Sequence, residues 1–337
     1  MQIIEQIADA RLDRPSLVTV GTYDGIHLGH QRVLGRLVAA ARESGCAAVV
    51  ITFQPRPQAV LAPHRPVYDL ITLTEKLALL EQLGVDLTVV LRFTPALAAQ
   101  SAAEFVGQLV DHLRMRELWL GVGAALGRHR EGDIPTLTQL GQTLGYDVRV
   151  VEPVVCEGEV VSSTRIRRHL HAGEIRAATT LLGRYPALSG EVVPGARRGR
   201  QIGFPTANLG VPPQLVVPPN GVYACFACVD EARWWAVTNI GVRPTFTDTE
   251  RTIEAHLLDF DGDLYGRALR LEMVEFLRPE MRFDGIAALR AQIAADAATA
   301  RTVLSAEAVL PQCPGAALRV PGLLQTCDPE PGPAGEP

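Results

Sequence analysis

The sequence predicts an α/β protein in two parts: an N-terminal doubly wound parallel-sheet domain, then a small antiparallel β-barrel domain with a C-terminal helix. Three observations predict this fold class. The chain has 337 residues, which is long for a single domain. Apolar strand-like runs alternate with amphipathic helical stretches in the N-terminal half. After Leu188 the pattern changes to successive strand-like runs separated by turn-rich segments.

The N-terminal half alternates strand and helix from its first apolar run. Residues 17–20 form a short strand, a glycine-rich turn follows, and a helix begins with apolar spacing over residues 33–38. The later elements are, in chain order, AAVVITF, LITLTEKLALLEQLG, VDLTVVLRF, SAAEFVGQLVDHL, LWLGVG, YDVRVVEPV and a helix within VSSTRIRRHLHAGEIRAATTLLG. Because strands that alternate with helices pair in parallel, this half predicts a doubly wound sheet.

The C-terminal half predicts a small antiparallel barrel. Its expected strands are SGEVV, GVYACFACV, WWAVTNIGV, TIEAHLLDF and ALRLEMVEFL. A terminal helix follows in FDGIAALRAQIAADAATARTVL, with Phe283, Ile286, Leu289 and Ile293 on one apolar stripe. The remaining segment is rich in Pro and Gly and is expected to be largely disordered. We therefore expect domains over residues 1–185 and 186–309, and a disordered tail over 310–337.

Composition narrows the range of partners. A formal net charge of -5 gives no overall attraction to nucleic acid or to membrane surfaces. The N-terminus lacks a basic segment followed by an apolar one, and no uncharged apolar run reaches 18 residues. Six cysteines are too few for a disulfide scaffold. We expect a cytoplasmic protein without nucleic-acid or membrane partners, and the sequence leaves its oligomeric state open.

The first candidate site follows the first strand, in GTYDGIHLGHQ. His27 and His30 flank Gly29 in an HxGH pattern where strand passes into helix. Amide donors and the positive end of the helix favour an anionic phosphate there, and two imidazoles can stabilise charge that builds on it. Gly29 leaves room for a nucleotide, and Gly21 and Asp24 of the same loop are further nucleotide-binding candidates. The alternative is a chance pair of surface histidines.

A second phosphate-binding element is expected in VVSSTRIRRHL. Ser162 or Ser163 is expected to cap a helix, while Thr164 and Arg167 project from its start. Hydroxyls, free amides and arginines would then converge on a phosphate tail. The alternative is a plain N-cap followed by a solvated basic face.

The strongest signal in the second domain is GARRGRQIGFPTANL, residues 195–209. Gly199 and Gly203 let backbone approach a phosphate, and Arg200 supplies positive charge. Thr206 and Asn208 are hard-oxygen ligands two residues apart. On an extended segment they share a face, where they can hold Mg²⁺ and leave its other positions for phosphate oxygens and water.

This second domain resembles the riboflavin kinase family, whose PTAN motif is matched by residues 205–208. Further matching blocks are NGVYA, TNIGVRPTF and IEAHLLDFDGDLYG. The resemblance implies phosphorylation of riboflavin to FMN by ATP. It also implies Glu254 as the general base, which agrees with the chemistry, since a primary alcohol must lose its proton. His256, on the same face as Glu254, is interpreted as a structural histidine.

The first domain resembles the nucleotidylyltransferase superfamily, and specifically the N-terminal module of bacterial bifunctional FAD synthetases. HxGH, VVSSTRIRRHL and the linker LLGRYPALSG carry this resemblance. It implies that the first domain adenylylates FMN to FAD. The implied small molecules are riboflavin, FMN and ATP as substrates, with Mg²⁺ as the metal.

Two positions depart from that family's pattern. Arg56 stands where its TFxPHP block has histidine, and Gly123 stands where it has Asp or Asn. A polar substrate contact is therefore missing at position 123. Arg56 could compensate, because it supplies a permanent cation. The alternative is a monofunctional riboflavin kinase with a degenerate N-terminal domain. A flavin-binding regulator without activity is disfavoured, because the candidate residues Thr206, Asn208 and Glu254 are all present.

Overall fold

The computed structural model describes residues 1–307 apart from positions 67, 196–198, 200–201, 231 and 245–248. Within this range the chain forms two compact units, residues 1–66 with 73–161 and residues 68–72 with 162–307. Arg200 and the predicted tail at 310–337 lie outside the described residues. The module boundary between residues 185 and 186 stays a prediction.

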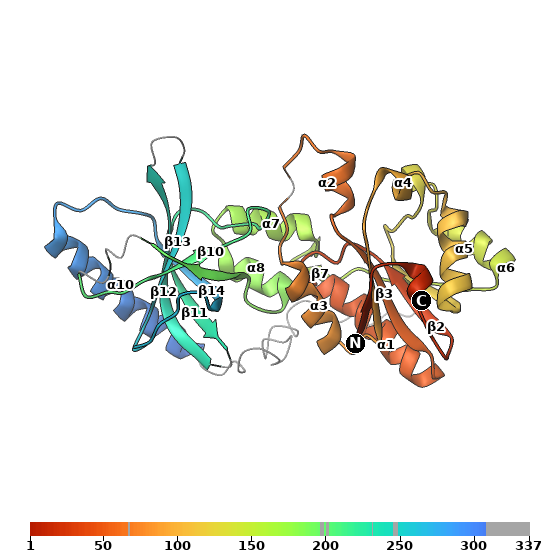
Figure 1. Ribbon diagram of the computed structural model, residues 1–337, viewed down its shortest axis with the longest axis horizontal. Helices are drawn as coiled ribbons and strands as arrows, with labels where there is room; N and C mark the ends of the chain where they lie inside the picture. The colour runs from red at the N-terminus through yellow and green to blue at the C-terminus, as the bar shows by residue number, and fades with distance from the viewer. Residues whose placement is uncertain (67, 196–198, 200–201, 231, 245–248, 308–337) are drawn as a thin grey trace, which may run out of the picture. The chain divides into compact units, whose positions relative to one another are not determined.

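The first unit is a parallel sheet of six strands in the order β1-β4-β3-β2-β5-β6, which confirms the predicted doubly wound fold (Figure 1). Its strands are β1 (Gln2–Ile4), β2 (Ser16–Val20), β3 (Ala47–Phe53), β4 (Leu87–Leu91), β5 (Met115–Gly121) and β6 (Asp147–Val151). Its helices are α1 (Leu28–Ser44), α2 (Pro57–Leu61), α3 (Leu73–Gln82), α4 (Pro95–Ala98), α5 (Ala102–Leu113) and α6 (Ile134–Leu144). A short hairpin, β7 (Val155–Cys156) and β8 (Glu159–Val160), follows β6.

Local sequence explains these elements. Strand β3 is buried over its first six residues, because helices cover both faces of a parallel sheet. Helix α5 begins with a capping box in which Ser101 and Glu104 exchange hydrogen bonds. Its residues Phe105, Val106 and Leu109 pack into the core of this unit. Helix α1 ends at Gly45, which takes the left-handed conformation with φ 66°.

The strand order places a crevice at the centre of the sheet. After β2 the chain adds β3 and β4 on one side, and then returns to place β5 on the other side of β2. In open parallel sheets ligands bind at such a reversal, outside the carboxyl ends of the strands. The loop after β2 contains the HxGH pattern.

The second unit contains a closed antiparallel barrel in the order β10-β13-β12-β11-β14-β9, which confirms the predicted barrel. Its strands are β9 (Ala187–Val193), β10 (Ala207–Gly210), β11 (Gly221–Val229), β12 (Ala232–Pro244), β13 (Thr249–Leu257) and β14 (Ala268–Arg278). Helices α7 (Ser163–His171) and α8 (Ile175–Leu182) precede the barrel, and α10 (Ile286–Ala306) follows it. The single helix expected over residues 161–183 is therefore wrong. Gly173, with φ 77°, lies in the break between two helices.

Helix α10 confirms the predicted C-terminal helix, and Leu289 and Ile293 of the predicted stripe are partly buried on its docked face. Ile286 of the expected apolar stripe is 66% exposed, whereas Asp296, Ala300 and Leu304 are buried. Ala300 and Leu304 join the barrel's core cluster. Asp296 is held by Arg278, whose guanidinium donates to both carboxylate oxygens at 2.9 and 2.7 Å. The stripe prediction is therefore wrong at Ile286, in the first turn of the helix, and it lacked the ion-paired Asp296 on the docked face.

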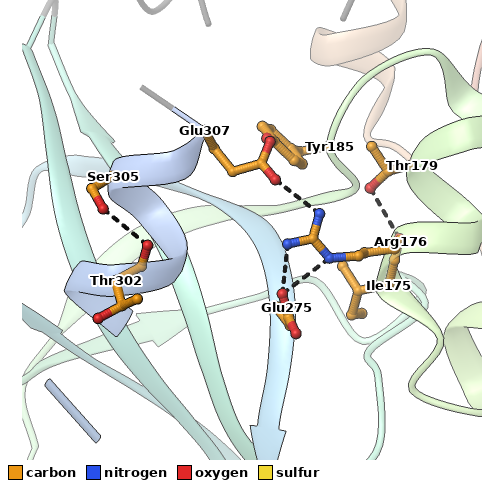
Figure 2. A network of polar contacts seen from close by, with 8 residues as sticks. All are labelled: Ile175, Arg176, Thr179, Tyr185, Glu275, Thr302, Ser305 and Glu307. Carbon is orange, nitrogen blue, oxygen red and sulfur yellow. Dashed lines mark hydrogen bonds and ion pairs between the residues drawn. The ribbon is translucent and has the colours of Figure 1, made fainter. Parts of the chain in front are cut away.

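A cluster of four residues, here called the Arg176 clasp, joins α8 and the end of α10 to the barrel. Figure 2 shows Arg176 of α8 between Glu275 of β14 and Glu307. The guanidinium donates to Glu275 Oε2 at 3.0 and 2.6 Å and to Glu307 Oε1 at 2.8 Å. The Tyr185 hydroxyl donates to Glu307 Oε2 at 2.5 Å. Together these bonds anchor three segments that are far apart in the sequence.

Among the helices that the structure describes, none combines the length and apolar character needed to cross a membrane.

Candidate active sites

A cavity of about 860 Å³ opens in the first unit at the carboxyl ends of its strands. Gly21 follows β2, Phe53 ends β3, and Gly121 ends β5, and all three line it. His27, Gly29 and His30 line it as well. Most of the predicted adenylyltransferase loop therefore lies on one cavity wall, at the reversal of strand order.

The two histidines are stacked on each other at the start of α1. His27 is the N-cap, and its Nδ1 accepts a hydrogen bond from the His30 amide at 3.4 Å. Their ring centroids lie 3.6 Å apart, and the planes are inclined by 18°. A neutral His27 that accepts at Nδ1 carries its proton on Nε2, where it can donate. A Cβ at position 29 would lie 3.2 Å from the His27 ring, so glycine fits this turn with least strain.

Asp24 belongs to the same loop, but its side chain is buried and does not line the cavity. It is 2% exposed and forms an ion pair with Arg56, which is 7% exposed, at 3.1 Å. Arg56, the departure from the family pattern, is thus the partner of a predicted nucleotide-binding residue. Lys76 is also buried, and its ammonium donates to the Thr22 carbonyl at 2.8 Å. Sequence reasoning missed both contacts, since their partners lie 32 and 54 residues apart.

The predicted phosphate-binding helix, α7, belongs to the second unit. Ser162 is its N-cap and accepts a hydrogen bond from the Arg165 amide at 3.2 Å, which leaves Ser163 and Thr164 in the first turn. Arg167 Nε donates to the Tyr68 carbonyl at 2.8 Å. The convergence of Ser163, Thr164 and Arg167 with the two histidines stays a prediction.

The second unit has its own cavity, of about 510 Å³, beside strands β10 and β13. Thr206 lines it, together with Asp261, Asp263 and Tyr265 of the loop after β13. Across the two strands Asn208 lies opposite Glu254, and Ala207 lies opposite Ala255. Because both alanines are buried, Asn208 and Glu254 share the other, partly exposed face. Thr206, directly before β10, lines the cavity, whereas Asn208 and Glu254 pair across β10 and β13 and are not among its lining residues.

Two glycines earlier in the chain lie close to the side chains of Thr206 and Asn208. A Cβ at Gly199 would lie 2.3 Å from the Phe204 carbonyl oxygen and 3.2 Å from Thr206 Oγ1. A Cβ at Gly195 would lie 2.1 Å from Asn208 Nδ2. Gly203 takes a left-handed φ of 86°. Gly195 was missed by sequence reasoning, although it begins the same glycine-rich segment.

The donor set at this position suits a hard divalent cation. Thr206 offers a hydroxyl oxygen and Asn208 an amide oxygen, and oxygen ligands are what Mg²⁺ prefers. Within the described ranges no group of three or more His, Cys, Asp or Glu side chains could hold a metal ion. Two protein ligands would leave a cation here most of its coordination positions for phosphate oxygens and water.

His256 holds the segment that leads into Thr206. Its Nδ1–H donates to the Pro205 carbonyl at 2.7 Å. The ring also meets Phe204 edge to face, with centroids 5.4 Å apart at 82°. The sequence interpretation of His256 as a structural residue agrees with these contacts.

Comparison with known proteins identifies both units. A family model described as FAD synthetase matches residues 9–165, and one described as riboflavin kinase matches residues 182–304. A bifunctional riboflavin kinase/FMN adenylyltransferase from Pseudomonas fluorescens is 38% identical over 91% of this chain and 99% of its own length. The protein of that name from Escherichia coli strain K12 is 39% identical over 85% of this chain and 91% of its own length.

A solved structure shares the fold over most of the chain. It is described as a macrolide-efflux protein from Streptococcus pneumoniae, and it matches with a TM-score of 0.82 and 30% identity, covering 89% of this chain and 98% of that one. Both family models and the curated relatives agree on one assignment. The chain belongs to the family of bifunctional riboflavin kinases/FMN adenylyltransferases, which are transferases.

Proposed function

We propose that the protein makes FAD from riboflavin in two ATP-dependent steps, with FMN as the product of the first step and the substrate of the second. The riboflavin kinase part of the chain transfers the γ-phosphate of ATP to the terminal hydroxyl of riboflavin and releases ADP. The FAD synthetase part transfers AMP from ATP to the FMN phosphate and releases pyrophosphate. We place both steps in the cytoplasm, with Mg²⁺ as the metal.

The observation that carries the kinase proposal is the pairing of Asn208 and Glu254 across β10 and β13, next to Thr206 on the cavity. Glu254 accepts the proton of the riboflavin hydroxyl as its oxygen attacks the γ-phosphorus. Thr206 and Asn208 would hold Mg²⁺, which when bound neutralises charge on the phosphates of ATP. Gly199 and Gly203, which carry no side chain, would let the backbone approach those phosphates.

The observation that carries the adenylyltransferase proposal is the stacked pair of histidines at the start of α1, on the wall of the larger cavity. The Nε2–H of His27 can donate to an oxygen of the ATP α-phosphate, on which negative charge builds during attack by FMN. The helix N-terminus adds its own positive potential. The alternative of an inactive first domain is disfavoured, because the cavity and both histidines are present despite Arg56 and Gly123.

The test is incubation of the full chain with riboflavin, ATP and Mg²⁺, with riboflavin, FMN and FAD separated by chromatography over time. FMN is expected first, followed by FAD. Accumulation of FMN without any FAD, even when FMN is supplied directly, would instead support the kinase with a degenerate N-terminal domain. Absence of FMN would overturn the kinase proposal.

A further inference from the structure

A polar contact to the substrate is missing from position 123, where this chain has glycine. Gly123 lines the larger cavity, and a Cβ built there meets no other atom within 4 Å. The space that a longer side chain would occupy is therefore open. Ala124 and Leu126, which also line this wall, carry no polar group that could replace it.

Arg130 brings a polar group to this gap from seven residues further along the chain. Its Nη2 donates to the Gly123 carbonyl at 2.9 Å, and its side chain lines the same cavity. A guanidinium has five N–H donors, and this bond uses one of them. Among the residues that the structure describes, the group has no acidic partner. It is thus a cation held at the cavity wall.

The backbone that presents Arg130 is strained and firmly anchored. His129 and Arg130 have φ of 50° and 60°, a left-handed conformation that non-glycine residues rarely adopt. Gly127 packs so tightly that a Cβ would lie 2.4 Å from the Ala102 nitrogen. Glu131 accepts a hydrogen bond from that same Ala102 amide at 3.0 Å. Such strain persists where surrounding structure enforces it, and it is concentrated at functional sites.

We infer that Arg130 is a substrate-binding residue for adenylyl transfer, whose guanidinium contacts a substrate phosphate and takes over the role of the missing side chain at position 123. Phosphate is the group that a guanidinium recognises best, through paired N–H donors. Both substrates of this cavity carry phosphate, so the ligand is the phosphate of FMN or that of ATP. The inference rests on the proposed adenylyltransferase function.

The test compares Arg130→Ala with Arg128→Ala in the full chain. Arg128 lies in the same loop, but it is 55% exposed, pairs with Glu131 and does not line the cavity. With FMN and ATP varied separately, Arg130→Ala is expected to raise the KM of one substrate by about 10- to 100-fold, the effect of losing a charged hydrogen bond. The substrate whose KM rises identifies the phosphate. Arg128→Ala should leave both KM values within about 2-fold.

Two further measurements separate binding from a structural role. Riboflavin kinase activity of the same variant, and its Tm, are expected to stay at wild-type values. Adding Gly123→Asn to Arg130→Ala is expected to recover part of the lost affinity, because open space surrounds position 123. Unchanged KM values in Arg130→Ala, or equal losses in Arg128→Ala, would overturn the inference. If the wild-type protein makes no FAD from FMN, the proposed function itself fails, and this inference with it.

Discussion

The carboxylate of Glu254 lies opposite Asn208 on the β10–β13 strand pair, one register position from the buried Ala207–Ala255 pair. This placement puts the proposed general base next to Asn208, a proposed Mg²⁺ ligand. Replacement by glutamine keeps the shape but removes the basic group. We expect Glu254→Gln to lower the rate of FMN formation by about 10²- to 10⁴-fold, the usual contribution of a general base.

The measurement is single-turnover FMN formation by the purified variant. Glu191→Gln is the matched control, because Glu191 is an exposed carboxylate of β9 that lies outside the Asn208–Glu254 pair. Circular dichroism should report an unchanged fold for both variants. Wild-type turnover in Glu254→Gln would show that Glu254 is not the general base.

We expect His256 to influence the kinase reaction through its contact with Pro205. Loss of its hydrogen bond to the Pro205 carbonyl should loosen the segment that positions Thr206. His256→Ala is expected to raise the KM for Mg-ATP by about 2- to 10-fold, the value of one neutral hydrogen bond, with a smaller effect on kcat. His256→Asn should recover part of this, since its amide can also donate. Equal KM values for all three proteins would argue against this positioning role.

Short motifs at the sites could be predicted from the sequence, and contacts between distant loops could not. His27 and His30, or Thr206 and Asn208, lie within one turn or one strand, so their spacing alone determines that they are neighbours. The Asp24–Arg56 ion pair depends on the conformations of two separate loops, one after β2 and one after β3. The Arg130 contact depends on left-handed backbone at non-glycine residues, which no sequence pattern indicates.

At the scale of elements, the Arg176 clasp (Figure 2) stabilises the end of α10 through Glu307. Burial raises the pKa of Glu307, but hydrogen bonds from Tyr185 and Arg176, with the charge of Arg176, outweigh burial and leave that pKa below its ordinary value. A carboxylate with a depressed pKa stabilises the fold at neutral pH. This contribution is lost as the pH falls below about 4.5 and through the folded-state pKa.

We expect Glu307→Gln to lower the free energy of unfolding by about 1 kcal/mol at pH 7, because solvent partly screens the clasp. The difference from wild type should shrink below pH 4. The control is Arg301→Met on the same helix, whose ion pair with Asp259 is exposed on both sides, at 42% and 71%. Arg301→Met should lower the free energy of unfolding by less than about 0.5 kcal/mol. Urea titrations at both pH values measure the two differences, and a pH-independent loss in Glu307→Gln would contradict the argument.

Long apolar elements could be predicted from the sequence more fully than short or partly polar ones. Strand β11 has the bounds expected from its nine-residue run, because every one of its residues is buried. Strands β1, β7 and β8 have two or three residues each, too few to show a period. Helix α10 was predicted with Leu289 and Ile293 on its docked face, but Asp296 of that face was missed, since an ion-paired aspartate is polar in the sequence and packs as part of the core.

At the scale of the whole molecule, each unit has its own hydrophobic core. Leu118 belongs to the core of the first unit, and Leu304 to that of the second, and both are fully buried. Scanning calorimetry is therefore expected to resolve two transitions. Leu118→Ala should destabilise the first unit, and Leu304→Ala the second, by about 2–5 kcal/mol each. Each variant should therefore lower the temperature of one transition. A single transition that both variants shift equally would show that the two cores unfold together.

The two sheets also differ in whether they have free edges. The barrel closes on itself, so each of its strands is paired on both sides. The open sheet ends at β6, where a row of backbone donors and acceptors lies at the boundary with solvent. On this strand Asp147 and Arg149 are 74% and 51% exposed and carry opposite charges, a feature that discourages strand addition by another chain. Strand addition is therefore expected to be prevented by closure in the barrel, and at the β6 edge of the open sheet by two charged side chains.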